Sequence, residues 1–145
     1  MSKVTLPTAG SARHALRFDG AERFYVGRSL IMGGLKDYEA ETFAAIAALI
    51  ETRAIHDFAD VGANVGIYSL TMKAMFPQLA VRAFEPTPEL AAAVRSLAKL
   101  NDLDIDLREL ALSNFDGTAS FFPPTRLMRP IRSISGSAMR SAPSR

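Results

Sequence analysis

Asp60-Val61-Gly62-Ala63-Asn64-Val65-Gly66 is the stretch that decides the fold of this chain. It follows a short apolar run and precedes a helical pattern, which predicts a strand, a tight turn and a helix. A second apolar run ends in Ala83-Phe84-Glu85-Pro86, so one helix separates two predicted strands. The first strand ends in a glycine turn and the second in a carboxylate. Nucleotide-binding α/β folds hold an adenosine-containing cofactor with this arrangement.

Strand and helix patterns alternate on both sides of the turn. The predicted strands cover 55–61, 79–84, 105–110 and 118–122, and the predicted helices cover 38–52, 67–76 and 88–100. Asp37 and Thr87 are expected N-caps, Pro88 suits a first helical position, and Asn101 is an expected C-cap. Residues 23–35, with three glycines, are expected to be extended with turns. The order predicts an α/β fold with a parallel, doubly wound sheet.

The composition indicates a soluble globular protein of modest size. The chain has 145 residues, 48% hydrophobic and 22% charged, which is enough for one domain with a core. It has no cysteine and two histidines, so we expect no disulfide, no thiolate site and no metal site. No apolar run approaches the ~20 residues that span a bilayer, and no signal peptide is visible in 1–10. We therefore expect a cytoplasmic protein without a membrane span.

The positive charge of the chain comes from its last residues. From 123 to 145 there is no acidic residue and no lysine, but there are five arginines, against a net charge of +2 for the whole chain. The rest of the chain is therefore mildly acidic. The segment has no convincing periodicity and no aromatic residue, so we expect an unstructured tail and no nucleic-acid partner.

The glycine turn departs from the two common phosphate-binding motifs. Counting from Gly62, the third position is Asn64 and the sixth is Ile67, where the dinucleotide fingerprint needs glycine. Gly66 is not followed by Lys and Ser or Thr, which excludes a P-loop. Asp60 at the strand end suits a cationic ligand group better than a pyrophosphate. S-adenosylmethionine carries a sulfonium and an ammonium and no phosphate, so it is the favoured cofactor, with Glu85 accepting hydrogen bonds from both ribose hydroxyls.

Four segments together resemble the FkbM-type methyltransferases. They are Asp60–Gly66, Ala83-Phe84-Glu85-Pro86-Thr87-Pro88-Glu89, Leu100-Asn101-Asp102-Leu103 and Ala111-Leu112-Ser113-Asn114-Phe115-Asp116-Gly117. The resemblance covers about residues 23–122. It implies a Rossmann-like class I methyltransferase fold that uses S-adenosylmethionine for O-methylation of a small molecule, sugar or lipid.

The resemblance also assigns cofactor-binding residues. The turn residues that match the methionine-binding positions are Asp60, Gly62, Asn64 and Gly66. Glu85 matches the ribose-binding acid, and Ser113 lies near the position where this family seats adenine. Tyr38 and Glu39 match positions near the cofactor pocket, although a first-turn acid favoured by the helix dipole explains Glu39 equally well. No residue matches a general base, so the catalytic residues are not assigned.

The family's pattern stops near Phe122. We therefore expect an N-terminal extension at 1–22, an incomplete methyltransferase domain at 23–122 that holds only the N-terminal half of the sheet, and a tail at 123–145. A frameshift or truncation near Phe122 is one hypothesis for this ending. The strand at 55–61 would then have an open edge, which favours self-association. The alternatives to an active methyltransferase are a non-catalytic remnant that binds the cofactor weakly or not at all, and a nicotinamide oxidoreductase.

Overall fold

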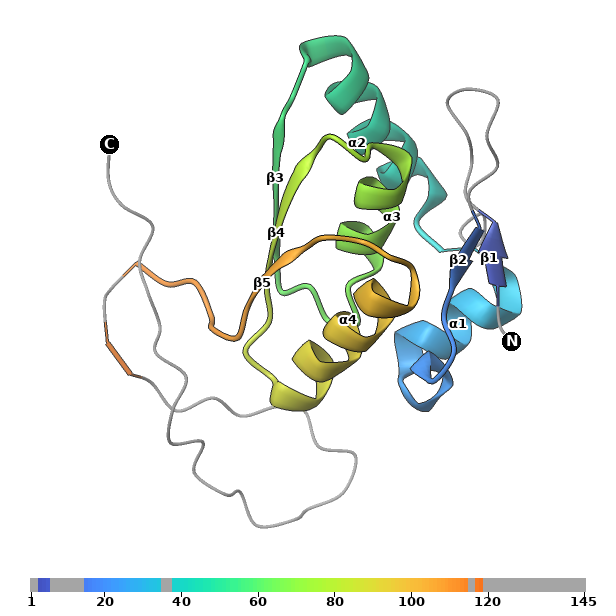
Figure 1. Cartoon of the computed structure of the whole chain (residues 1–145), viewed down its shortest axis with the longest axis vertical. Helices are drawn as coiled ribbons and strands as arrows, with labels where there is room; N and C mark the ends of the chain where they lie inside the picture. The colour runs from blue at the N-terminus through green and yellow to red at the C-terminus, as the bar shows by residue number, and fades with distance from the viewer. Residues whose placement is uncertain (1–2, 6–14, 35–37, 115–116, 119–145) are drawn as a thin grey trace.

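The computed structural model describes residues 3–5, 15–34, 38–114 and 117–118, and it is an α/β structure. Its main sheet contains β3 (Asp57–Val61), β4 (Ala80–Phe84) and β5 (Asp106–Arg108), in the order β3-β4-β5 (Figure 1). Both pairings are parallel, with Asp60 beside Ala83 and Phe84 beside Arg108. The predicted parallel sheet is therefore confirmed.

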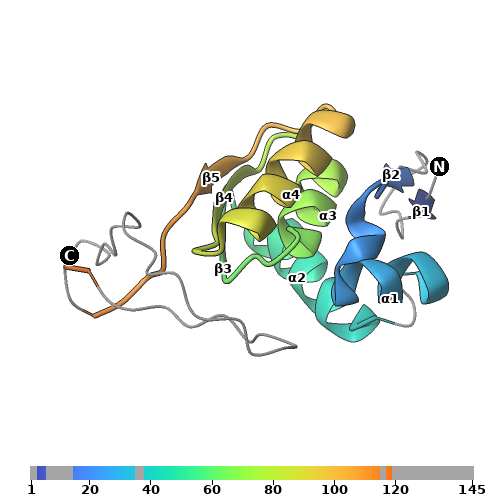
Figure 2. The same ribbon diagram turned by 90° about the horizontal axis from the view of Figure 1, so that it is seen from below.

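Three helices cover one face of this sheet. They are α2 (Ala40–Arg53), α3 (Ile67–Met75) and α4 (Pro88–Leu100), and Figure 2 shows all three on the same side of the strands. α3 is the most buried helix, with Leu70 and Met72 fully covered. It connects β3 to β4, and α4 connects β4 to β5, as expected of parallel strands joined by helical crossovers. No helix in the described ranges is long and apolar enough to cross a membrane.

A smaller N-terminal region packs against the helices. β1 (Lys3–Thr5) and β2 (Ala15–Arg17) form an antiparallel pair, followed by the short helix η1 (Ala21–Arg23) and by α1 (Tyr25–Gly33). Leu16, Phe18 and Leu30 are buried in the common core. The Asn101 side chain accepts a hydrogen bond from the Arg17 amide at 2.8 Å and donates one to the Arg17 carbonyl at 2.9 Å. These two hydrogen bonds attach β2 to the end of α4.

The prediction of an extended segment at 23–35 is wrong, because most of it forms α1. The glycines suggested turns, but Gly27 lies inside the helix and is buried. A Cβ atom at Gly27 would lie 2.1 Å from the carbonyl oxygen of Ala21. Gly27 therefore allows α1 to pack closely on η1, and the chain does not turn at this residue.

The other predicted elements are confirmed with shifted ends. α2 begins at Ala40 with Glu39 as its N-cap residue, so Asp37, which lies outside the described residues, is not the N-cap. Thr87 and Asn101 hold the predicted cap positions of α4, although Thr87 makes no side-chain cap bond. Each strand is shorter than its apolar run. The strand predicted at 118–122 and the tail at 123–145 lie outside the described residues, apart from Thr118.

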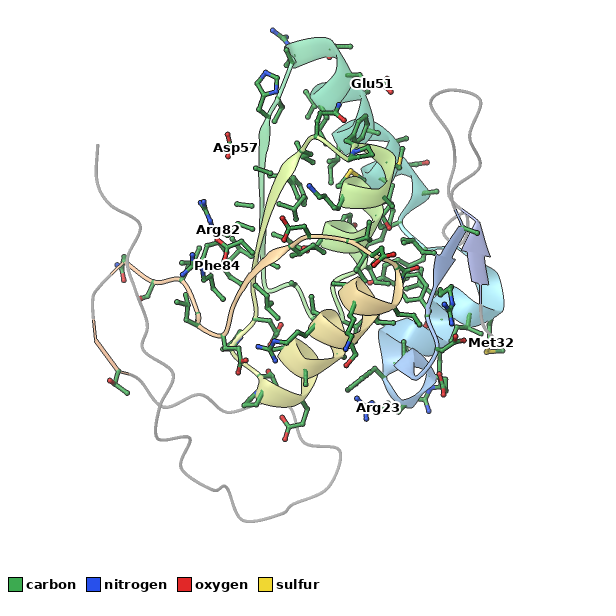
Figure 3. All side chains as sticks on the ribbon, in the orientation of Figure 1. Arg23, Met32, Glu51, Asp57, Arg82 and Phe84 are labelled. Atoms are coloured by element: carbon green, nitrogen blue, oxygen red, sulfur yellow. The ribbon has the colours of Figure 1, made fainter. Side chains whose placement is uncertain are left out.

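The second face of the sheet carries no helix in the described part of the chain. Figure 3 shows Asp57, Arg82 and Phe84 pointing away from the helices. Asp106 forms ion pairs there with Arg82 at 3.2 Å and with Arg108 at 2.7 Å. Within the described sheet β3 pairs only with β4, so it is an edge strand as predicted, and Val61 at its end is 61% exposed.

Candidate functional site

The glycine turn is fixed to the end of the neighbouring strand. The amides of Gly62 and Ala63 both donate to the carbonyl oxygen of Phe84, at 2.9 and 3.0 Å. Three alternate residues of the turn have left-handed backbone conformations, with φ of 79° at Gly62, 55° at Asn64 and 78° at Gly66. Glycine adopts this conformation without steric cost, and asparagine tolerates it better than most residues. The turn thus places the carboxyl ends of β3 and β4 side by side.

Gly66 also allows the turn to lie close to α4. A Cβ atom at this position would be 3.0 Å from Cγ1 of Val94 and 3.1 Å from its Cγ2. Val94 is fully buried, so its side chain has little room to move. The glycine is therefore needed for its backbone conformation and also for its size.

Asp60 is a buried carboxylate at the end of β3. It is 9% exposed, and its Oδ2 accepts hydrogen bonds from the amide of Ser69 at 3.1 Å and from the Ser69 hydroxyl at 2.6 Å. Burial raises the pKa of Asp60, the hydrogen bonds from Ser69 lower it, and the nearby carboxylate of Glu85 raises it further. The net effect is a raised pKa, so the fold holds this negative charge at a cost.

Glu85 is a second buried carboxylate, one strand away. It is 5% exposed. Its Oε2 accepts a hydrogen bond from the amide of Asn64 at 2.8 Å, and its Oε1 accepts one from the amide of Thr87 at 2.9 Å. Glu85 therefore ties the glycine turn to the start of α4. A carboxylate has about four lone-pair sites, so each oxygen can still accept a hydrogen bond from a ligand.

Neither carboxylate is balanced by a cationic side chain of the described residues. The ion pairs formed there lie elsewhere, at Arg17–Asp19, Arg82–Asp106, Arg95–Glu109 and Arg108–Asp106. The described residues also contain no group of three or more acidic, His or Cys side chains that could hold a metal ion. Among the residues that the structure describes, this negative end of the sheet is therefore stabilised only by backbone amides and one serine.

Five of the six predicted cofactor residues come together at this site, and Ser113 is not joined to them. Asp60, Gly62, Asn64, Gly66 and Glu85 all lie in or against the turn. Ser113 follows β5, and its hydroxyl contacts Oδ1 of Asn114 at 3.4 Å. The amide of Glu85 donates to the carbonyl of Arg108, so the chain leading to Ser113 leaves the sheet beside the site.

Two residues in the first turn of α3 belong to this region and were not predicted from the sequence. The amide and hydroxyl of Ser69 donate to Asp60, and the Tyr68 hydroxyl donates a hydrogen bond to Oε2 of Glu39. The Tyr68 ring stacks on Phe43 with centroids 4.4 Å apart. Burial, followed by the Glu39 carboxylate, raises the pKa of Tyr68 to about 12. The contact of Ser69 could have been predicted from the sequence, because Ser69 carries a hydroxyl three positions after Gly66. A residue in the first turn of a helix lies close to the end of the strand that precedes it.

Fold and site together define a class of protein. It is a Rossmann-like α/β structure with buried carboxylates where two parallel strands end at a glycine turn. The chain is similar to the methyltransferase sdnD of Sordaria araneosa, with 38% identity over an alignment of 68 residues; the match covers 44% of this chain and 26% of that protein. It thus spans about a quarter of the length of this curated relative. No family model and no solved structure matches the chain.

Proposed function

We propose that this chain is an S-adenosylmethionine-dependent methyltransferase of the FkbM type, with its methyltransferase domain at 23–122. The observation that carries the proposal is the pair of buried carboxylates, Asp60 and Glu85, at adjacent strand ends without a cationic side chain among the described residues. A buried negative site of this kind is stabilised by a positively charged ligand. The similarity to a methyltransferase supports the same conclusion.

Each predicted residue has a role in this proposal. The left-handed turn of Gly62, Asn64 and Gly66 allows a close approach of the methionine portion to the backbone. Asp60 stabilises the positive charge of that portion. The free lone pairs of Glu85 accept hydrogen bonds from the two ribose hydroxyls, each worth about 1.5–3 kcal/mol because the acceptor is charged.

Adenine would lie toward the segment after β5. Ser113 belongs to that segment, which begins where Arg108 accepts a hydrogen bond from the amide of Glu85. Its hydroxyl is half-buried and is not tied to the turn. Of the six predicted cofactor-binding residues, Ser113 is therefore the one whose proposed role depends most on a bound ligand.

The chemistry of the reaction needs positioning more than activation. When bound, S-adenosylmethionine supplies a methyl group that is already activated by its sulfonium. The residues of this chain would hold the cofactor in line with an acceptor hydroxyl and keep the positive charge stable until transfer. A small molecule, a sugar or a lipid is the proposed acceptor. Self-association through the edge strand β3 is a further proposal.

The same site disfavours a nicotinamide cofactor. A dinucleotide would bring a pyrophosphate to the turn, where the Asp60 carboxylate would repel it. Binding of the cofactor without methyl transfer is the remaining alternative, since the matched part of the relative covers 26% of its length. An assay for methyl transfer separates this alternative from the proposed activity.

Calorimetric titration with S-adenosylmethionine and with NADH tests the proposal. We expect saturable binding of the first and none of the second, with binding lost in Asp60→Ala and in Glu85→Ala. Asp106→Ala, which removes a carboxylate from the exposed sheet face, is the matched control and should bind as the unchanged chain does. NADH binding, or S-adenosylmethionine binding that survives both site substitutions, would contradict the proposal.

A further inference from the structure

Exposed apolar side chains concentrate around β3. Of the five large hydrophobic residues that are clearly exposed in the described chain, three lie between the last turns of α2 and the end of β3: Leu49, Ile55 and Val61, which are 52%, 37% and 61% exposed. In the described sheet, the edge of β3 that faces away from β4 is unpaired. We call residues 55–61 the edge segment. An unpaired edge beside apolar side chains is a place where another strand can pair.

Alternate residues of the edge segment present their backbone groups to the open edge. The carbonyl of His56 accepts a hydrogen bond from the start of β4 at 2.8 Å, and the amide of Gly62 donates one to the end of β4 at 2.9 Å. The backbone groups of successive residues in a strand point to opposite edges. The amides and carbonyls of Asp57, Ala59 and Val61 therefore point away from β4 and can bond to a second strand.

The edge segment is complementary to a second copy of itself. Phe58 is its central residue, so an antiparallel pair with a two-fold axis at Phe58 overlaps along the whole segment. Phe58 then lies opposite Phe58 of the other copy, Ile55 lies opposite Val61, and His56 lies opposite Asp60. An aromatic pair, an apolar pair and a pair of a ring N–H donor with a carboxylate each stabilise antiparallel strands, and no like charges oppose each other.

The hydrogen-bonding pattern fits this register. Asp57 and Ala59, whose backbone groups point to the open edge, oppose each other across the pair and can exchange two hydrogen bonds. Phe58 and the His56–Asp60 pairs take the narrow positions between them, where opposite Cα atoms are only about 4.5 Å apart. A two-fold axis at Ala59 would instead place Phe58 opposite Asp60.

We propose that a second copy of the chain pairs with β3 in this register and completes the candidate site, with His56 of each copy beside Asp60 of the other. Oδ2 of Asp60 accepts the two bonds from Ser69, whereas its Oδ1 accepts no hydrogen bond from the described residues. His56 is exposed in the single chain, and its ring can donate an N–H to Oδ1 across the pair. His56 is therefore a positioning residue for the carboxylate of the other copy. The shared site rests on the proposed function, whereas the strand pair does not.

The first experiment tests the strand pair and its register. The chain has no cysteine, so Ile55→Cys and Val61→Cys each carry a single thiol at an exposed position. A short bismaleimide should join a mixture of the two variants into a covalent dimer. It should leave each variant alone unlinked, because identical positions lie six residues, or about 20 Å, apart along the pair. A chain that sediments as a monomer at every concentration, or a variant that links to itself as readily as to the other, would overturn the proposal.

The second experiment tests the shared site. His56→Ala and Asp60→Asn are titrated calorimetrically with S-adenosylmethionine, alone and in an equimolar mixture. Each variant alone should bind more weakly than the unchanged chain. In a mixed dimer, one site combines Asp60 of the first variant with His56 of the second. About a quarter of the sites should therefore regain full affinity, because mixed dimers are half of the population and one of their two sites is intact.

The controls separate a lost site from a lost fold. His56→Gln keeps a side-chain N–H donor and should retain most of the binding, whereas a residue that only supports the fold would show no such rescue. Gln78→Ala changes an exposed residue outside the edge segment and should behave as the unchanged chain does in both experiments. Cross-linking in the proposed register without recovery in the mixture would show that the site is not shared. Cross-linking without any S-adenosylmethionine binding by the unchanged chain would contradict the proposed function, and the shared site with it, and leave the strand pair standing.

Discussion

Two groups of charged residues on the same three-stranded sheet differ in their exposure and in their charge partners. On the exposed face, Asp106 is paired with Arg82 and Arg108, and all three side chains are in contact with solvent. At the carboxyl edge, Asp60 and Glu85 are 9% and 5% exposed, and within the described part of the chain they receive hydrogen bonds only from amides and Ser69. The first group has its countercharges, whereas the second has no cationic side chain beside it among the described residues.

The direction of the pKa shifts reflects this difference. The ion pairs with Arg108 and Arg82 lower the pKa of Asp106. Burial and the Glu85 carboxylate raise the pKa of Asp60 in spite of its two bonds from Ser69. The fold thus stabilises the charged form of the exposed Asp106 and destabilises the charged form of the buried Asp60. A cationic ligand at the buried site, as proposed, explains this difference best.

Glu85→Ala should cause the largest loss of stability. It leaves the amides of Asn64 and Thr87 without their acceptors, at about 1–3 kcal/mol for each. Glu85→Gln keeps one acceptor oxygen and should lose about half as much. Urea unfolding measures both changes. Equal stability of Glu85→Ala and the unchanged chain would show that this carboxylate does not hold the turn.

Gly66→Ala should destabilise the chain by about 1–2 kcal/mol through its left-handed backbone, and by more through its contact with Val94. A second substitution, Val94→Ala, makes room for the new methyl group. Thermal unfolding of the two single variants and the double variant gives their coupling. We expect the double variant to be more stable than the sum of the single effects predicts, and simple additivity would argue against the close packing.

Asp60→Asn should change stability and binding in opposite directions. The amide oxygen still accepts the bonds from Ser69, and the variant loses a buried charge next to Glu85, so the folded state should become slightly more stable at pH 7. Affinity for S-adenosylmethionine should fall at least about tenfold. Unfolding and calorimetric titration of one preparation test both. A variant that loses stability and affinity together would indicate a structural role alone.

The pH dependence of these effects has a defined sign. The pKa of Asp60 is raised in the folded state above its ordinary 3.8, so its contribution to stability is greatest below that value and is lost as the pH rises through the raised pKa. The stability of Asp60→Asn relative to the unchanged chain should therefore increase over this pH range. Asp106 has a lowered pKa, and its contribution is lost as the pH falls through it. Unfolding of Asp60→Asn and Asp106→Asn across acidic pH measures the two trends. If the stability of the two variants, relative to the unchanged chain, changed with pH in the same way, the contrast would be contradicted.

Asp106→Asn should have the smallest effect. Its ion pairs are exposed, with the Asp106 side chain 42% accessible, so the loss should stay below about 1 kcal/mol and shrink with added salt. Binding of S-adenosylmethionine should not change. Unfolding at low and high ionic strength provides the measurement, and a large loss that is independent of salt would mean that this network supports the fold.

The sequence predicted the parts of the fold that depend on local pattern. The apolar runs before Gly62 and Glu85 predicted β3 and β4, because each is a short, mostly apolar run that ends at a turn. α1 was missed because the reason for Gly27 is a contact with Ala21, which local spacing does not reveal. In the site, Asp60 and Glu85 were predicted from their places at strand ends. The bonds from Ser69 to Asp60 and from Tyr68 to Glu39 were not predicted, since they depend on how α3 packs between β3 and α2.

The central claim is that the carboxyl edge of the sheet is built for a positive ligand charge. The most direct test compares the affinities of S-adenosylmethionine and S-adenosylhomocysteine, which differ in the sulfonium methyl group, for the unchanged chain and for Asp60→Asn. Calorimetric titration at one ionic strength gives the four values. We predict that Asp60→Asn weakens S-adenosylmethionine by a factor several times larger than it weakens S-adenosylhomocysteine. Equal losses for the two ligands, or no loss for either, would contradict the claim.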